Sequence, residues 1–241
     1  MENYRCVTSV QEIQEYIGNA AVVAFDYETA PDEPYRMEEK AALDPYKSHI
    51  VGCSFSTKEH TGIYVPVAHK VGENIENALF LCFLKSFLTN KNIIKIAHNI
   101  AFESAVSCHH GIVIQPPVYD TICAAQMTLK SNYEFRKLAD SGLKKLASEL
   151  CHEPLPTFSE VTNGRHFDEL DAQDSETVRY GCADSDFALR LYHIFNNWFD
   201  RFLPKHRYIA EQIESPTAVY LGIMKHNGVP VDADLMKSHQ Q

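Results

Sequence analysis

The feature that most constrains the fold is an apolar segment that runs directly into a pair of carboxylates. Residues 21–25 read AVVAF, which has the length and composition of a buried β-strand, and Asp26, Tyr27 and Glu28 follow without a break. Because side chains alternate along a strand, Asp26 and Glu28 project from the same face. Such a pair forms half of a divalent-metal site, although an isolated D-x-E is more often two solvated residues in a turn.

A second polar group follows another apolar segment, residues 93–97, with the sequence IIKIA. The next residues predict a helix over 99–110, on which Asn99 and Glu103 are four positions apart and share a face. The alternative is an Asn that caps the helix and a Glu that is merely exposed. We expect His98 to pack beneath this motif and not to take part in chemistry.

A third pattern lies in the long helix predicted over residues 174–199. Tyr180 and Asp184 are four positions apart and therefore lie on one face of that helix. The alternative is a tyrosine and an aspartate at the surface. A fourth polar residue, Asp120, stands between a short predicted strand and a predicted helix, where an N-cap is the favoured interpretation.

The order of the predicted elements indicates an α/β fold. A strand, a polar loop and a strand hairpin are followed by alternating helices and strands and then by helices alone, which predicts a mixed sheet with helices on its faces. The expected strands are 21–25, 50–55, 62–67, 93–97 and 118–119. The expected helices are 10–17, 77–88, 99–110, 121–129, 142–150, 174–199 and 204–226, with loops over 31–46 and 151–167.

Composition excludes several classes of protein. The 241 residues are 45% hydrophobic and 22% charged, which is ordinary for a globular chain. No run of about 18 apolar residues could span a membrane, and the polar N-terminal segment is not a secretory signal. Seven scattered cysteines without a C-x-x-C pair form neither a zinc module nor a disulfide framework, so we expect a reducing compartment and a cytoplasmic location.

The net charge is −10, from 22 Lys and Arg against 32 Asp and Glu. This balance argues against broad electrostatic capture of duplex nucleic acid, which needs a basic face. It is compatible with a site that grips a short single strand through divalent metals, because such a site is itself built of carboxylates.

The order and spacing of these motifs resemble the DnaQ-like 3′–5′ exonucleases of the DEDDy type. The family patterns D-x-E, H-N-x-x-F-D/E and Y-x-x-x-D correspond to segments 26–28, 98–103 and 180–184, within a resemblance that runs from about residue 22 to residue 192. Lesser signatures also match: Asp120-Thr121, the G-L-K-x-L-A segment at 142–147 and the T-F-x-E-V segment at 157–161. The resemblance implies a ribonuclease H-like mixed sheet flanked by helices.

The resemblance also implies a catalytic site with two divalent ions, Mg²⁺ or Mn²⁺. In the family pattern, Asp26, Glu28 and Asp184 share one ion, and Asp26 bridges to the second. Glu103 completes the carboxylate set, although the family more often has Asp there. Tyr180 orients the attacking water through its hydroxyl.

Three further residues are implied to bind substrate. Asn99 resembles an Asn near the terminal nucleotides, and Phe158 resembles an aromatic residue that stacks against a frayed 3′ end. The alternative for Phe158 is a loop aromatic anchored in the core. Thr29 is expected to offer its backbone N–H to the substrate.

The C-terminal segment resembles the entry to the polymerase domain of family A, the polymerase I-like enzymes. The patterns are I-E-x-P at 213–216 and an apolar helix followed by N-G-V-P-V-D at 227–232. We therefore expect an exonuclease domain over 1–203 and the start of a truncated polymerase domain over 204–241. The resemblance implies that the whole protein is a phage-type polymerase whose exonuclease domain proofreads single-stranded DNA 3′ ends. The expected partner of this domain is the remainder of the polymerase chain, and no membrane contact is expected.

Two other functions stay open. A ribonuclease D-like RNA exonuclease would share the fold and the chemistry but not the substrate. A degenerate exonuclease domain would serve as a DNA-binding scaffold without catalysis, and the four acidic residues, all present, argue against it.

Overall fold

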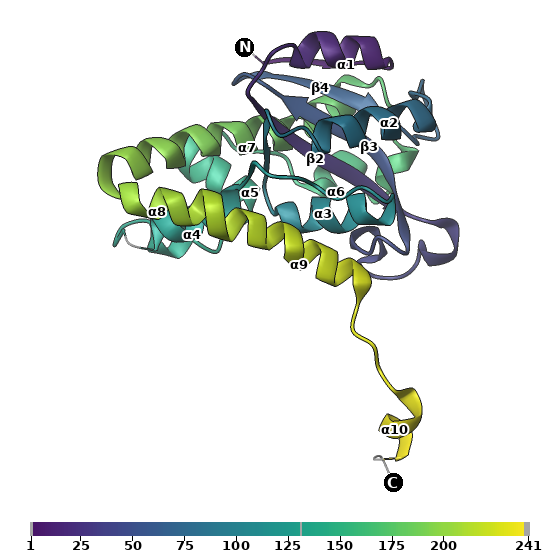
Figure 1. The fold of residues 1–241 in the computed structure, drawn as a ribbon. Helices are drawn as coiled ribbons and strands as arrows, with labels where there is room; N and C mark the ends of the chain where they lie inside the picture. Colours follow the sequence, from purple (N-terminus) through teal and green to yellow (C-terminus); the bar gives the residue numbers. More distant parts are fainter. Residues whose placement is uncertain (1, 131, 239–241) are drawn as a thin grey trace.

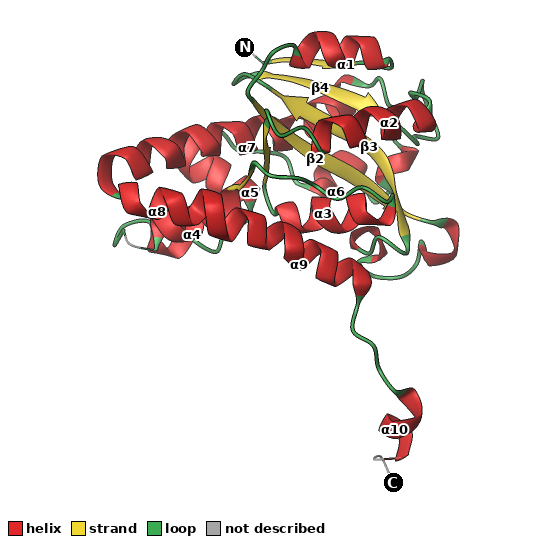
Figure 2. Cartoon of the chain, in the orientation of Figure 1, coloured by secondary structure: helices red, strands yellow, loops and turns green. Residues whose placement is uncertain are grey.

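The computed structural model describes residues 2–130 and 132–238, and within them six strands form one mixed sheet. The spatial order is β1-β4-β3-β2-β5-β6, with helices on both faces (Figures 1 and 2). The strands are β1 Asn3–Cys6, β2 Val22–Pro31, β3 Ser48–Ser56, β4 Thr61–Pro66, β5 Ile94–Ala97 and β6 Val118–Asp120. Strand β2 runs antiparallel to β3 and parallel to β5, which confirms the predicted mixed, ribonuclease H-like sheet.

The helices agree with most of the predicted segments. They are α1 Val10–Ile17, α2 Asn77–Leu88, α3 Ile100–His109, α4 Thr121–Leu129, α5 Leu143–Leu146, α6 Phe158–Thr162, α7 Ser175–Phe202, α8 Pro204–Ile209, α9 Ser215–Asn227 and α10 Ala233–Ser238. No helix in the described part of the chain is long and apolar enough to cross a membrane.

Strand β2 separates two hydrophobic cores, and this decides where its carboxylates point. Phe25 and Tyr27 belong to the core beneath α2 and α3, where Phe25 contacts the Phe87 ring edge-on and the Tyr27 hydroxyl lies 3.0 Å from Ser107 Oγ. Ala24 belongs to the other core, which includes α4 and α7. Because side chains alternate, residues 26 and 28 share the face of Ala24 and are directed towards α7.

Helix α7 is the long helix that the sequence predicts, and it extends three residues further than expected. Phe187, Phe195 and Phe199 are fully buried and seat the helix on the sheet. Figure 1 shows α7 behind the sheet and α2 and α3 in front of it. A rigid, buried helix of this kind holds residues 180–184 at a fixed place above β2.

The C-terminal segment is joined to the rest of the fold through α9, which lies along α3 (Figure 1). Gly222 makes this approach possible, because a Cβ there would lie 2.3 Å from the Ala101 carbonyl oxygen. Ser104 Oγ donates a hydrogen bond to the Val219 carbonyl over 2.8 Å. A domain boundary at residue 203 therefore stays a prediction, while residues 204–227 are packed on the same body as the sheet.

Some predicted elements differ from those observed. Strand β2 continues six residues beyond Phe25 because it pairs with β3 along that length. The predicted helix over 204–226 is divided by a π-helical turn over 210–214, and the loop expected over 151–167 contains α6. Strand β1, which the sequence analysis did not predict, pairs in parallel with β4.

Candidate active site

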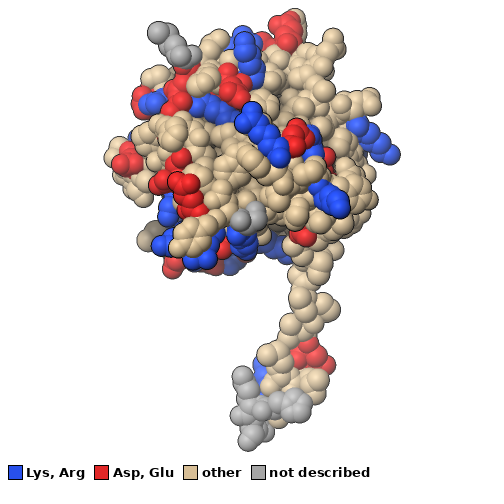
Figure 3. Space-filling model, turned by 90° about the vertical axis from the view of Figure 1, so that its left-hand side faces the viewer, with Lys and Arg blue, Asp and Glu red and all other residues tan. Residues whose placement is uncertain are grey.

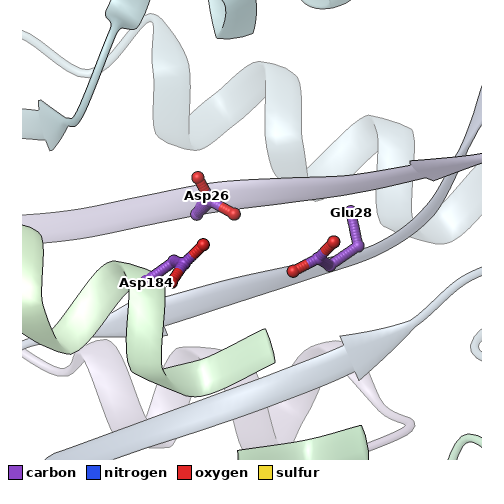
Figure 4. Close-up of side chains that lie close together, drawn as sticks. All are labelled: Asp26, Glu28 and Asp184. Atoms are coloured by element: carbon purple, nitrogen blue, oxygen red, sulfur yellow. The ribbon is translucent and has the colours of Figure 1, made fainter. Parts of the chain in front are cut away.

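Three carboxylates converge where β2 faces α7. Asp26 and Glu28 project from β2 and Asp184 from α7, and their side chains point towards one another in Figure 4. One oxygen atom from each lies within 4.8 Å of the others. Glu28 is buried, while Asp26 and Asp184 are partly exposed, so the cluster is open to the surface on one side. The structure thus brings together three of the predicted site residues from distant parts of the chain.

The cluster concentrates negative charge in a poorly solvated place. Burial raises the pKa of Asp26 well above its ordinary value, and Asp184 raises it further. Burial also raises the pKa of Glu28, with Asp26 as the next cause, and burial raises the pKa of Asp184 to about 6. The nearby ammonium of Lys144 acts in the opposite direction on all three pKa values. A bound cation would relieve the same repulsion.

Glu103 lies close to this cluster but is not a member of it. The side chain comes from α3 and is 1% exposed, and its Oε2 atom has no hydrogen-bond partner within the described residues. Burial raises the pKa of Glu103 well above its ordinary value, and Asp26 is the next cause. An orphaned, buried carboxylate oxygen beside an acidic cluster is a position that a cation or its water would satisfy.

Tyr180 stands beside the carboxylates with its hydroxyl held by Lys144. The Lys144 ammonium donates to Tyr180 Oη over 3.0 Å, and the Tyr180 ring packs against Phe167 with ring centres 5.6 Å apart. Burial and the charge of Glu28 raise the pKa of Tyr180 above its ordinary value. The phenol therefore keeps its proton at neutral pH.

Phe158 is the exposed aromatic residue of this region. It is the first residue of α6, 43% exposed, and its ring stacks on Phe167 at a centre-to-centre distance of 6.3 Å. Thr157 caps α6 together with Glu160 in a capping box. Phe158 is thus both anchored to the core and presented to solvent, so the two interpretations of this residue are compatible.

Asn99 lies at the carboxyl end of β5 but outside α3, which begins at Ile100. Its backbone is left-handed, with φ of 79°, and its exposed side chain makes no capping hydrogen bond. The prediction that Asn99 and Glu103 share a helical face is therefore wrong, because only Glu103 is in the helix. His98 is partly buried and its Nδ1 atom lies 2.8 Å from Thr121 Oγ1, as expected for a structural residue.

Asp120 is the N-cap of α4, as the sequence indicates, and its carboxylate also binds backbone N–H groups at the start of α3. Its Oδ1 atom accepts a hydrogen bond from Ile122 N–H at the start of α4. The same carboxylate accepts from the backbone N–H groups of Asn99 and Ile100 at the start of α3. Asp120 therefore fixes the position of the N-terminus of α3, the helix that carries Glu103.

Thr29 follows a register shift in the β2–β3 pairing, immediately after Glu28. Its hydroxyl donates to the Ala42 carbonyl over 2.7 Å, which attaches the polar loop over 31–46 to the end of β2. The same loop is held at Arg36, whose guanidinium pairs with the buried carboxylate of Asp168. This loop is therefore attached both to the end of β2 and to Asp168.

One functional candidate, Lys144, was not predicted from the sequence. The residue lies in the G-L-K-x-L-A signature, so the signal was present. Its significance was not visible because α5 contacts Tyr180 only in the folded chain. On the face shown in Figure 3, acidic and basic side chains are interspersed.

The comparisons with known proteins agree with this geometry. Residues 1–200 match the model of a protein family described as 3′–5′ exonuclease. The chain belongs to this 3′–5′ exonuclease family. The resemblance drawn from the motifs is thereby confirmed, and the family is one of nucleases.

Among sequence relatives of this exonuclease, DNA polymerase I of Borreliella burgdorferi is 26% identical over 239 residues, which is 97% of this chain and 24% of that protein. The chain spans about a quarter of the length of the curated relatives that it matches.

Two solved structures show the fold of this exonuclease. NrnC of Brucella melitensis has a TM-score of 0.62 and 19% identity, with 97% of this chain and 99% of that chain covered. RNase D of Trypanosoma brucei, in complex with RNA U12, has a TM-score of 0.67 and 16% identity over 96% of this chain and 73% of its own. A structure of the Brucella protein contains bound Mg²⁺.

Proposed function

We propose that this chain removes nucleotides from the 3′ end of single-stranded or frayed DNA, and that it proofreads for a family A DNA polymerase. The observation that carries the proposal is the convergence of Asp26, Glu28 and Asp184 beside the Tyr180 phenol. The polymerase setting is supported by the DNA polymerase I relative, whose similarity extends over 97% of the chain and so includes most of the C-terminal segment.

The donor set fits Mg²⁺ or Mn²⁺, and we propose two such ions as cofactors. All donors are carboxylate oxygens, which these hard cations prefer. Three of them lie within 4.8 Å of one another, and the nearby Oε2 of Glu103 is buried without a hydrogen-bond partner among the described residues. Bound ions would supply positive charge to the phosphodiester and lower the pKa of the attacking water.

The side chains of this site would have separate roles in binding the ions and in positioning the attacking water. Asp26, Glu28 and Asp184 would hold the ions, and Glu103 would add a fourth carboxylate from α3. Tyr180 keeps its proton because its pKa is raised, so its hydroxyl can position the attacking water by hydrogen bonding.

The terminal nucleotides would bind over residues at the edge of the cluster. Phe158 presents a ring on which a base can stack, and such stacking does not depend on base identity. Asn99 has an exposed side chain at the carboxyl end of β5 that can bind polar groups of the strand. Thr29 lies one residue beyond Glu28, where its backbone N–H would contact the substrate.

An RNA exonuclease is the second candidate, favoured by the structural likeness to RNase D. Both functions use the same carboxylates, so the difference lies in the binding of the sugar. The 2′-hydroxyl is the group by which a protein distinguishes RNA from DNA.

Digestion of DNA and RNA oligomers of the same sequence tests the proposal. The protein would be incubated with a DNA primer carrying a 3′ mismatch, and with the RNA of the same sequence, with Mg²⁺, with Mn²⁺ or with a chelator. We expect stepwise release of nucleotides from the DNA only when a metal is present. The Asp26→Ala protein should release none, and full activity of that variant would refute the site. Faster release from RNA would favour the second candidate.

A further inference from the structure

Lys144 connects three parts of the site. It belongs to α5, and its Nζ atom lies 2.7 Å from the Pro156 carbonyl oxygen and 3.0 Å from Tyr180 Oη. Nζ also lies 4.3 Å from the centre of the Tyr180 ring, so the cation contacts the ring face as well as the hydroxyl. Pro156 stands two residues before Phe158. Lys144 therefore links α5, the approach to α6 and the tyrosine of α7.

The direction of these hydrogen bonds constrains the phenol. An ammonium group only donates hydrogen bonds, so Tyr180 Oη accepts from Lys144. The phenolic hydrogen must then point to another acceptor. Glu28 and Asp184 lie close enough to the hydroxyl to act on it electrostatically. Lys144 thus occupies an acceptor position of the Tyr180 oxygen and leaves the phenolic hydrogen available for donation to another group.

We infer that Lys144 is a positioning residue of the exonuclease site, which fixes Tyr180 through its hydroxyl. This inference rests on the proposed function. Lys144 does not itself contact the reacting atoms, and its effect on the reaction passes through the hydroxyl of Tyr180.

The neighbouring residue provides a matched control. Lys145 is on the same helix and is exposed. Lys145→Met removes the same charge from the same helix as Lys144→Met. Lys144→Arg restores a donor with a positive charge at the position under test.

The expected result is a fall in kcat for Lys144→Met of about 10- to 100-fold, because a hydrogen-bonding group is no longer oriented. The KM for single-stranded DNA and the activity of Lys145→Met should each stay within about twofold of the unsubstituted protein. Lys144→Arg should recover part of the lost kcat. An unchanged kcat in a folded Lys144→Met protein overturns the inference.

A double-mutant cycle separates positioning from a general charge effect. In a Tyr180→Phe background the hydroxyl is absent, so Lys144→Met should lower kcat by less than about threefold. The same fold-loss in both backgrounds would mean that Lys144 acts without Tyr180, and it would overturn the inference.

Two measurements do not depend on activity. Calorimetric titration with Mn²⁺ in the absence of DNA should show that Lys144→Met binds the ion at least as tightly as the unsubstituted protein, because a competing positive charge is gone. Weaker binding would overturn the inference. If the unsubstituted protein releases no nucleotides, the proposed function fails on its own. Lys144 is then judged from a crystal structure of Lys144→Met, in which an unmoved Tyr180 ring overturns the inference and a reoriented ring supports it.

Discussion

The backbone N–H of Ile100 donates a hydrogen bond to Asp120 Oδ2 over 3.0 Å. The other oxygen of this carboxylate accepts from Asn99 N–H over 3.1 Å and from Ile122 N–H over 2.8 Å. Asp120 is 3% exposed, so water cannot easily replace these bonds if the carboxylate is lost. One buried side chain thus holds the starts of α3 and α4, and with them the position of Glu103.

Removal of this carboxylate should destabilise the protein. We expect Asp120→Ala to lower the free energy of unfolding by about 2–4 kcal/mol, because three backbone N–H groups lose their acceptor. Asp120→Asn keeps one acceptor oxygen and should cost about half as much. Urea unfolding followed by circular dichroism measures both. A change below about 0.5 kcal/mol in Asp120→Ala would show that the double cap is unimportant.

The metal-free cluster should be a source of instability. The raised pKa of Asp26, caused by burial and then by Asp184, means that its ionised form is costly in the folded chain. In chelator, Asp26→Asn should therefore raise Tm by about 2–5 °C. Mg²⁺ or Mn²⁺ should raise the Tm of the unsubstituted protein and leave that of Asp26→Asn nearly unchanged. An equal metal response in both proteins, measured by differential scanning calorimetry, would be inconsistent with the cluster as the binding site.

His98 should make stability depend on pH. Burial lowers the pKa of His98 from 6.5 to about 4, so the folded chain holds this ring neutral. Above pH 6.5 the ring is neutral in both the folded and the unfolded chain, so it does not lower the free energy of unfolding. As the pH falls from 6.5 towards 4, the unfolded chain binds a proton that the folded chain does not, and stability is lost. At pH 5 the loss should be about 1–2 kcal/mol.

His98→Gln is the variant that checks this effect. The difference in unfolding free energy between pH 8 and pH 5 should be smaller in His98→Gln than in the unsubstituted protein. Identical pH profiles for the two proteins would mean that His98 is not held neutral in the fold.

The aromatic ring of Phe158 should contribute to strand binding and little to folding. Phe158→Ala should weaken the affinity for single-stranded DNA by about 10-fold, from the loss of one stacked base. Phe158→Tyr should bind nearly as well as the unsubstituted protein. Fluorescence anisotropy in chelator measures the affinity without cleavage. An unchanged Kd in Phe158→Ala would leave the residue as a core anchor only, through its contact with Phe167.

Much of the fold could be predicted from local pattern, because its buried strands and long helices have strong signals. Helix α2 has the predicted bounds, and α7 contains the predicted Tyr180–Asp184 pair. Strand β1 could not be found in this way, since its four residues are half-exposed and depend on pairing with β4. The π-helical turn over 210–214 likewise depends on contacts, including the hydrogen bond from Ser215 Oγ to the Ala210 carbonyl.

The site was predictable to the extent that a residue's place in a motif determines its neighbours. Asp26 and Glu28 follow from strand alternation, and Asp184 follows from the family pattern. Lys144 could not be assigned from its motif, because its hydrogen bond to Tyr180 joins residues 36 positions apart. The sequence spacing predicted that Asn99 lies in the same helix as Glu103. Its backbone is instead left-handed, so Asn99 lies outside that helix.

A crystal soaked in Mn²⁺ would show, through the anomalous scattering of the ion, whether the three carboxylates bind a metal. We expect a strong anomalous peak between the carboxylates of Asp26, Glu28 and Asp184, and no such peak in crystals of Asp26→Ala. A crystal of the unsubstituted protein in which those side chains diverge and no ion lies among them would contradict this expectation.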